Sequence, residues 1–387
     1  MKEGWSYKKL GEVCDFEGGS QPPKSEWINH PQDGYVRMLQ IRDFTRSRNA
    51  EIEYVKISKK IRLCKADDIL IGRYGASVGK ILTGLAGAYN VAIIKSIPNE
   101  ELISKAFIKR YFEARSFQSV LLKVCASRAA QAGFSKDDIC DTPIPVPPLS
   151  EQHSIVSRLD TAFSHIDALK ANAEKQLNEA RKLFQAELTE CMKPKEGWEE
   201  KKIGDVFQTY AGGTPLKSGK GYYEGGTIPW IRSGEVCQMY IRDCEMCITE
   251  EGMKNSSAKY YPVDTILVAM YGATAAQVGI LKFEATSNQA VCGILPHKDF
   301  IPEYIYYWFT NIQKDLAAQA QGGAQPNLSQ VKIKKVSISY PSRTIQHSIV
   351  SHLDSLSSTI RKLEELQQKT LAECDALKQA MLREVFE

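Results

Sequence analysis

The hexapeptide Gln152-His-Ser-Ile-Val-Ser157 occurs a second time, without change, as Gln346-His-Ser-Ile-Val-Ser351. The two copies are separated by half the length of the 387-residue chain. Two more segments recur at nearly the same distance: Lys2-Glu-Gly-Trp5 as Lys195-Glu-Gly-Trp198, and Asp67-Asp-Ile-Leu-Ile71 as Asp264-Thr-Ile-Leu-Val268. Self-similarity at one fixed period indicates duplicated structural units. The sequence therefore predicts a tandem repeat of two similar halves.

A long helix is predicted to begin near each hexapeptide. Apolar residues recur there at alternating spacings of three and four, a pattern typical of a coiled-coil-like seam. A helix of ~44 residues is ~65 Å long, longer than a domain of about 150 residues, so we expect the two helices to pack on each other. The alternative is a surface helix packed on its own domain. The predicted seam residues are Ile155, Leu159, Ile166, Leu169, Leu177, Ile349, Leu353, Ile360 and Leu363.

A compact α+β domain is predicted before each long helix. In the first half, β-rich runs at 35–41, 68–72 and 89–97 precede one helical stretch at 104–125. The second half has the same order, with runs at 227–231, 265–270 and 289–295 before a helix at 302–319. Strands followed by helices favour an α+β fold. The predicted boundaries are 1–148 and 194–342 for the domains, and 149–193 and 343–387 for the helices.

Composition and charge fit an ordinary globular protein. The chain is 43% hydrophobic and 25% charged, with a net charge of +4. The first domain carries most of the basic excess, 23 Lys and Arg against 17 Asp and Glu, whereas residues 194–342 hold 15 of each. No apolar run would cross a bilayer and the start has no signal-peptide core, so we expect a cytoplasmic protein with reduced cysteines and no membrane partner.

Two motifs resemble catalytic or metal-binding sites, but neither matches the residue pattern that such a site requires. Gly72-Arg-Tyr-Gly-Ala-Ser-Val-Gly-Lys80 has the wrong glycine spacing for a phosphate-binding loop, and Ile81 stands where the loop needs Ser or Thr. Cys244 and Cys247 have the spacing of zinc ligands, but no second Cys or His pair lies near them in the sequence. Because no catalytic constellation appears in either half, we expect no catalytic residues, no metal and no cofactor.

The loops of both domains are rich in residues that bind nucleic acids. Arg, Lys, Gln and Asn donate paired hydrogen bonds to base edges, and Ser, Thr and Gly suit phosphates. The alternative is that these loops are only solvated turns. The predicted DNA-binding residues are Ser20, Gln21, Lys24, Gln40, Arg42, Arg73, Tyr74 and Gln131 in the first domain, and Thr214, Lys217, Lys220, Arg232, Ser233, Tyr271, Gln325 and Asn327 in the second.

The whole chain resembles the specificity subunits of type I restriction–modification enzymes. The segments that carry the resemblance are the Glu-Gly-Trp opening of each half, Gly212-Gly-Thr-Pro215, Ile228-Pro-Trp-Ile231, Gln325-Pro-Asn-Leu-Ser329, and Ile144-Pro-Val-Pro-Pro-Leu-Ser-Glu-Gln152. Their order, repeated twice, is more specific than any one of them. The first half differs from this pattern at Gly19-Ser-Gln-Pro-Pro23 and Gln131-Ala-Gly-Phe134. We expect these differences to affect which bases are recognised, and not whether the chain belongs to the family.

The resemblance implies a division of labour. The two domains would be target-recognition domains for the halves of a split, asymmetric site in double-stranded DNA. The helices would be antiparallel spacers that bind two modification subunits, which carry the methyltransferase chemistry, while restriction and translocase subunits complete the complex. The alternatives are the specificity partner of a type IIB-like system, or an enzyme of another class, a diverged DNA methyltransferase or nuclease.

Overall fold

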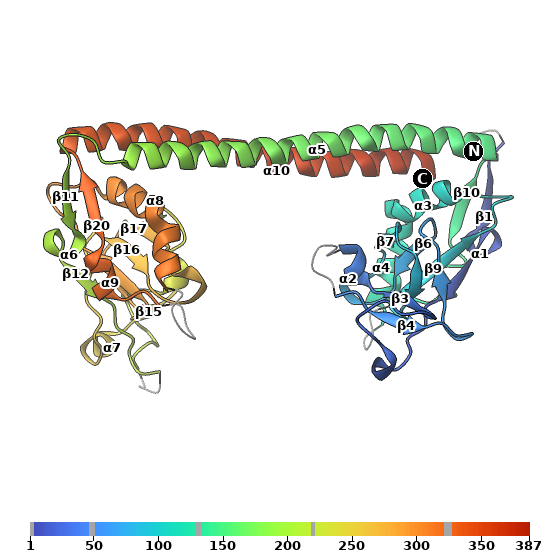
Figure 1. Ribbon diagram of the computed structural model, residues 1–387, viewed down its shortest axis with the longest axis horizontal. Coiled ribbons are helices and arrows are strands. Elements are labelled where there is room, and N and C mark those ends of the chain that lie inside the picture. Colours follow the sequence, from blue (N-terminus) through green and yellow to red (C-terminus); the bar gives the residue numbers. More distant parts are fainter. Residues whose placement is uncertain (1–3, 46–50, 129–132, 218–220, 321–326) are drawn as a thin grey trace. The chain divides into compact units, whose positions relative to one another are not determined.

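The computed structural model describes residues 4–45, 51–128, 133–217, 221–320 and 327–387 (Figure 1). Contacts divide the chain into two compact units. Unit 1 comprises Met1–Ala173 with Gln368–Glu387, and unit 2 comprises Glu174–Gln367. Each unit holds one α+β domain together with part of each of two long helices, α5 (Leu149–Met192) and α10 (Arg343–Phe386). The predicted fold class, a tandem repeat of α+β domains with two long helices, is confirmed.

The domain of unit 1 is built from two four-stranded sheets and a separate strand pair. The sheet orders are β2-β9-β6-β7 and β4-β3-β8-β5, and β1 pairs with β10. The strands are β1 (Ser6–Lys9), β2 (Cys14–Gly18), β3 (Tyr35–Leu39), β4 (Tyr54–Lys56), β5 (Leu63–Cys64), β6 (Ile69–Gly72), β7 (Ile81–Leu82), β8 (Gly87–Tyr89), β9 (Ile93–Pro98) and β10 (Pro143–Val146). Its helices are α1 (Leu10–Val13), α2 (Ile41–Thr45), α3 (Lys105–Glu113) and α4 (Arg115–Ala126).

The domain of unit 2 has a similar plan, with a five-stranded and a three-stranded sheet in place of two four-stranded ones. Its sheet orders are β12-β19-β16-β17-β14 and β15-β13-β18, and β11 pairs with β20. The strands are β11 (Glu199–Lys202), β12 (Thr209–Ala211), β13 (Ile228–Ile231), β14 (Tyr240–Ile241), β15 (Cys247–Ile248), β16 (Ile266–Ala269), β17 (Val278–Leu281), β18 (Thr286–Ser287), β19 (Val291–Ile294) and β20 (Ser337–Tyr340). Its helices are α6 (Ile203–Val206), α7 (Glu250–Lys254), α8 (Pro302–Ala320) and α9 (Gln330–Lys335).

One predicted helix is two helices in the structure. The stretch predicted at 104–125 is interrupted at Ala114, whose backbone is extended (φ −72°, ψ 146°) between α3 and α4. The Gln118 side chain donates to the carbonyl of Phe112 at 2.6 Å, a carbonyl in the last turn of α3. A local side chain therefore satisfies backbone that a continuous helix would satisfy itself. The corresponding helix of unit 2, α8, runs through without a break, as predicted.

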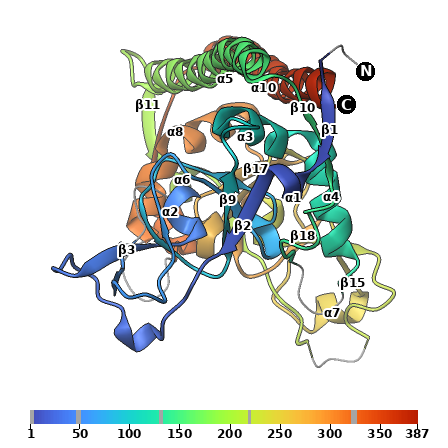
Figure 2. The same cartoon turned by 90° about the vertical axis from the view of Figure 1, so that its right-hand side faces the viewer.

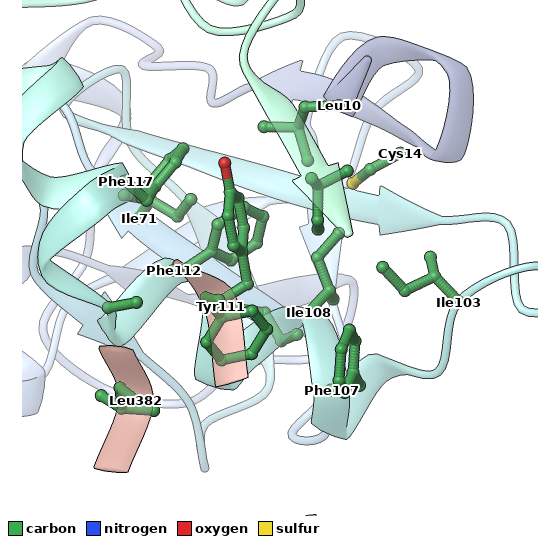
Figure 3. Packing of buried hydrophobic residues seen from close by; sticks show 14 of the residues in the cluster. Leu10, Cys14, Ile71, Ile103, Phe107, Ile108, Tyr111, Phe112, Phe117 and Leu382 are labelled. Carbon is green, nitrogen blue, oxygen red and sulfur yellow. The ribbon is translucent and has the colours of Figure 1, made fainter. Parts of the chain in front are cut away.

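The core of unit 1 includes the end of α10 (Figure 3). Tyr111, Phe112 and Phe117 pack against one another, with ring centroids 4.8–6.0 Å apart. Leu382 and Phe386, near the end of α10, are buried in the same cluster. The Phe386 ring lies 5.5 Å from that of Tyr111. The last turns of α10 are therefore part of the core of the first domain.

The core of unit 2 includes the end of α5 in the same way. Leu188 and Met192 of α5 are buried together with Tyr304 and Phe309 of α8. They occupy the positions of the repeat that Leu382 and Phe386 occupy in unit 1. Each domain thus buries the beginning of the long helix that follows it and the end of the other one.

Within each unit the long helices pair antiparallel. In unit 1, Lys170 of α5 binds Asp375 of α10 at 2.8 Å, and Asp167 binds Lys378 at 2.6 Å. In unit 2, Arg181 of α5 binds Glu364 of α10 at 2.6 Å. Glu187 of α5 also lies 3.0 Å from His352 of α10. In both units the residue numbers of α5 rise as those of α10 fall, which is the antiparallel arrangement that the family resemblance implies.

Most predicted seam residues are buried. Ile155, Leu159, Ile166, Leu177 and Leu353 are at most 5% exposed. Ile349, Ile360 and Leu363 are half-buried.

The prediction for Leu169 was wrong, because this side chain is 57% exposed. After Ile166 a spacing of three leads to Leu169 and a spacing of four leads to Lys170, and both spacings fit the alternating pattern of a seam. The covered row passes through Leu159, Phe163 and Ile166, and then through the partly covered Lys170.

In the part of the chain that the structure describes, no helix is both long enough and apolar enough to span a lipid bilayer.

A buried glutamine joins each domain to its long helix. Gln152 is 0% exposed; its amide group donates to the carbonyls of Leu102 (2.9 Å) and Pro147 (2.8 Å), and its carbonyl accepts from the backbone N–H of Ser104 (2.8 Å). In the same way, Gln346 is 0% exposed. It donates to the carbonyls of Asp299 and Pro341 and accepts from the N–H of Ile301, each at 3.0 Å. The repeated hexapeptide therefore begins with a residue that fixes the domain on the helix.

We expect Gln152→Leu and Gln346→Leu to destabilise their own units. Each removes three hydrogen bonds and leaves buried backbone groups unpaired, at a cost of about 1–3 kcal/mol per group. Hydrogen exchange checks this locally: the Ser104 amide should lose protection in the first variant and the Ile301 amide in the second. Gln176→Leu, at an exposed position of α5, is the matched control. Unchanged protection of Ser104 in Gln152→Leu would contradict the proposed role.

Candidate nucleic-acid interface

A glycine-containing loop follows β2 in unit 1 and β12 in unit 2. Gly19 and Gly212 donate their backbone N–H to Ile93 and Val291, each at 3.0 Å. A Cβ atom on Gly19 would lie 2.1 Å from the Asn90 carbonyl oxygen. One on Gly212 would lie 2.2 Å from the corresponding oxygen of Asn288. Only glycine permits this approach. The two loops therefore have the same backbone geometry, although their sequences differ.

The side chains that follow these glycines differ between the units. Ser20 Oγ accepts from the backbone N–H of Arg62 at 3.0 Å, and Gln21 is exposed. In unit 2, Thr214 donates to the side chain of Gln289. The loop backbone is thus common to both units, while the polar groups it presents are not.

Three predicted residues of unit 1 converge on one carboxylate, that of Glu53. Gln40 donates to Glu53 at 2.8 Å and Arg42 at 2.5 Å, and Lys24, in the short 3-10 helix η1 (Lys24–Glu26), forms an ion pair with it. Burial alone would raise the pKa of Glu53, but the contacts with Lys24, Gln40 and Arg42 outweigh it and lower the pKa. Glu53 therefore holds together donors that can also bind phosphates or bases.

The backbone at Gln40 is fixed by a hydrogen bond to the buried carboxylate of Asp43. Its N–H donates to Asp43 at 2.7 Å, and Asp43, which is 4% exposed, also binds Arg37 at 2.8 Å. Gln40 follows β3 directly, and β3 and β4 lie on the side of the unit 1 domain away from α5 (Figures 1 and 2). The carboxamide of Gln40 thus stands on a fixed backbone at one end of the domain.

Arg232 has the same place in unit 2. It follows β13 directly, and its N–H donates to Glu235 at 2.7 Å, as that of Gln40 does to Asp43. Its guanidinium forms an ion pair with Glu245, 13 residues further on, the same separation as between Gln40 and Glu53. Ser233 begins the short helix η3 (Ser233–Glu235). The two domains therefore present different side chains, Gln and Arg, from the same backbone frame.

The predicted residues Thr214, Lys217 and Arg232 line one hollow in unit 2. Its volume is about 580 Å³, and the remaining lining residues are Tyr223, Trp230, Met246, Asn288 and Gln289. The Trp230 indole N–H donates to the carbonyl of Gly213 at 2.9 Å, and the Tyr223 ring meets that of Trp230 edge-on at 5.8 Å. An aromatic wall with polar groups at its rim suits an unpaired or partly exposed base edge.

A second pair of matching positions is formed by Tyr74 and Tyr271, which are 37% and 38% exposed. Each precedes a short 3-10 helix, η2 (Gly75–Ser77) or η4 (Gly272–Thr274). Tyr74 forms an antiparallel bridge with Gly133, and Tyr271 forms one with Asn327.

Arg73 is held beside the first of these tyrosines. Its guanidinium lies 5.2 Å from the centroid of the Tyr74 ring, and its Nε donates to the carbonyl of Phe134 at 3.1 Å. The position of Arg73 is thus fixed by the backbone and an aromatic ring rather than by a carboxylate.

Some candidates were missed, and others lie outside the described residues. Glu53, Glu245, Asn288 and Gln289 were not predicted, although the acidic residues share one spacing from Gln40 and Arg232 and could have been found from it. Gln131, Lys220 and Gln325 belong to segments outside the described residues. The structure brings Lys24, Gln40 and Arg42 together in unit 1, and Thr214, Lys217 and Arg232 together in unit 2.

We expect Glu53→Gln to increase the affinity of the chain for DNA of any sequence. The substitution removes the charge that neutralises Lys24 and Arg42, so the dependence of binding on salt should steepen by about one phosphate contact. Fluorescence anisotropy with a random-sequence duplex at several salt concentrations measures this. Glu51→Gln makes the same change of net charge at an exposed neighbour; an equal gain of affinity in both variants would show that Glu53 has no special part.

Comparisons with known proteins agree with the geometry. A family model described as Type I restriction modification DNA specificity domain matches residues 2–179 and again residues 195–372. The chain is 29% identical over 230 residues to the Type I restriction enzyme EcoR124I/EcoR124II specificity subunit of Escherichia coli, covering 58% of this chain and 57% of the relative. It is 33% identical over 193 residues to the MjaIX specificity subunit of Methanocaldococcus jannaschii, covering 48% and 44%. The matches thus span about half the length of these relatives.

Solved structures also match over the full length. One of them concerns complex assembly and conformational transition of the type I R-M system, and one of its chains superposes with a TM-score of 0.79 at 17% identity. The match covers 100% of this chain and 98% of that one. At this identity the likeness shows a shared fold.

Proposed function

The chain belongs to the type I restriction–modification DNA specificity family, and from this membership we propose that it is the sequence-recognising subunit of such a system. The observation that carries the proposal is the pair of matching positions, Gln40 and Arg232. Each stands on the same backbone frame at the end of a strand, and each bears a side chain that binds a base edge in a bidentate manner. One frame with two different recognition groups fits an asymmetric target made of two half-sites.

We propose that the first half-site includes an adenine bound by Gln40 and the second a guanine bound by Arg232. Gln pairs with the N6 and N7 atoms of adenine, and Arg with the O6 and N7 atoms of guanine. The carboxylates of Glu53 and Glu245 would orient these side chains before DNA binds. Lys24, Arg42 and Arg73 would contact phosphates, which contribute affinity and position the domain.

The long helices are proposed to bind the modification subunits. Each unit exposes leucines on them: Leu169 and Leu377 in unit 1 are 57% and 52% exposed, and Leu183 and Leu366 in unit 2 are 71% and 61% exposed. Exposed apolar side chains that gather on a surface mark protein interfaces. Leu183 and Leu377 hold matching positions of the repeat, one in each unit, which supports two modification subunits. Methyl transfer, cleavage and translocation would be the work of these and the restriction subunits, and the chain itself would have no catalytic part.

We expect Arg42→Ala and Arg73→Ala to weaken binding to all DNA sequences. The loss of one phosphate contact lowers the slope of log K against log salt by about 0.9, with the recognised sequence unchanged. Binding measured with target and random duplexes over a range of salt concentrations tests this. Arg158→Ala, on the exposed face of α5, is the control for loss of charge. If discrimination instead falls by ~1–3 kcal/mol at one base pair, the arginine contacts a base.

Methylation mapping tests the proposed function directly. The chain is produced with its modification subunit in a host, and methylated sites are determined by single-molecule sequencing. We expect a split target, with Arg232→Gln changing the preferred base at one position of one half-site and Gln40→Arg at one position of the other. Arg242→Gln, on an exposed side chain of the same domain as Arg232, should leave the target unchanged. Methyl transfer by the purified chain alone, given S-adenosylmethionine, would contradict the proposal.

A further inference from the structure

Three side chains of different chemistry meet where α5 and α10 pair in unit 2. Glu187 and Cys191 lie on α5 and His352 lies on α10. His352 Nε2 is 3.0 Å from Glu187 Oε1, and Cys191 Sγ is 3.7 Å from the same oxygen. All three ligand atoms lie within 4.8 Å of one another. Among the residues that the structure describes, this is the one group of three or more His, Cys, Asp or Glu side chains arranged in this way.

The backbone that carries these groups is held firmly. Glu187 and Cys191 are four residues apart, so they lie on the same face of α5, one turn from each other. Leu188 beside them and Leu353 beside His352 are both 0% exposed and belong to the core of unit 2. Thr189 also binds Asn311 of α8 at 2.9 Å. The three ligand atoms are therefore brought together by packed helices and not by a loop.

We propose that Glu187, Cys191 and His352 form a binding site for a divalent transition-metal ion of the Zn²⁺ class. A carboxylate, a thiolate and an imidazole are all ligands of Zn²⁺, with bonds of about 2.0–2.3 Å. In a tetrahedral site with such bonds the ligand atoms are roughly 3.3–3.8 Å apart. The distances in unit 2 scatter around this range, so small rotamer changes suffice. Water would take the fourth position.

The ligand set favours Zn²⁺ over the hard cations. Mg²⁺ and Ca²⁺ require oxygen ligands, whereas sulfur and imidazole nitrogen suit Zn²⁺ and Co²⁺. Binding forms a bond from the metal to Cys191 Sγ, and the thiol proton is released to solvent. The two anionic ligands, Glu187 and thiolate, then balance the charge of the ion. The site would fasten the end of α5 to the beginning of α10.

Unit 1 lacks the site. The positions of the repeat that correspond to Glu187, Cys191 and His352 are Met381, Val385 and Arg158. Met381 and Val385 are partly buried against the core of unit 1. The metal would thus stabilise unit 2 only. In unit 1, apolar contacts of Met381 and Val385 stand at the corresponding positions.

A metal titration of the full chain tests the proposal. The purified protein is stripped with a chelator, kept reduced, and titrated with Zn²⁺ or with Co²⁺, whose absorption spectrum reports thiolate ligation and four-coordination. We expect one equivalent to bind. The midpoint of thermal unfolding should rise by about 3–5 °C at free metal about 100 times the dissociation constant. Failure of the chain to bind either ion would overturn the proposal.

Variants assign the bound metal to these residues. Cys191→Ser and His352→Gln should each lose the bound equivalent and the thermal shift, and Glu187→Gln should weaken binding about 10–100-fold. Cys244 and Cys247, two closely spaced thiols elsewhere in unit 2, provide the matched control. The double variant Cys244→Ser/Cys247→Ser should bind the metal as the parent does. Metal retained by Cys191→Ser, or lost in the Cys244/Cys247 variant, would place the ion elsewhere and overturn the assignment.

Discussion

The buried carboxamides of Gln152 and Gln346 are the constraint on which each half of the molecule depends. Each must accept one backbone N–H and donate to two carbonyls in a place without access to solvent. Among side chains of this length only glutamine offers both an acceptor and two donors. The turn before α3 or α8, the proline segment before the long helix, and the helix itself are thereby tied at one point. This explains why glutamine begins the hexapeptide in both halves while the loops around it differ.

The second constraint is an exchange of helix ends. The end of α5 is buried in the core of unit 2 and the end of α10 in that of unit 1. Leu188 and Met192 hold the places in the repeat that Leu382 and Phe386 hold in the other half. Neither domain is therefore completed by its own half of the sequence. The first domain needs the last turns of α10, which follows the second domain in the sequence, and the second domain needs the last turns of α5, which follows the first. The duplication and the antiparallel pairing are in this sense one feature.

Much of this was open to sequence analysis, and the rest was hidden for physical reasons. Exact repetition and a helical period can both be seen in the sequence itself, so the tandem α+β domains and the paired helices were predicted. The exposed position of Leu169 was not, because the seam pattern allows either Leu169 or Lys170 after Ile166, and the position that faces α10 is Lys170, which binds Asp375. The break at Ala114 depends on the side chain of Gln118, which also donates to the distant carbonyl of Gly79 at 2.9 Å and is therefore placed by the fold. Glu53 and Glu245 were not predicted because acidic residues repel phosphates, although here they contact Gln40, Arg42 and Arg232.

The proposed roles of Gln40 and Arg232 would explain how one fold can serve two different half-sites. The parts that set the backbone, the strand before each residue and the carboxylate three residues after it, are kept in both domains. The side chain at this position contacts a carboxylate 13 residues further on in both domains, and the Arg232 guanidinium also lies 3.5 Å from Glu235. Under the proposed function, a substitution there would alter the hydrogen-bonding pattern offered to a base without disturbing the core. Duplication followed by change at such positions turns a symmetric arrangement into an asymmetric one, since the frame is inherited by both halves and the recognition group is not.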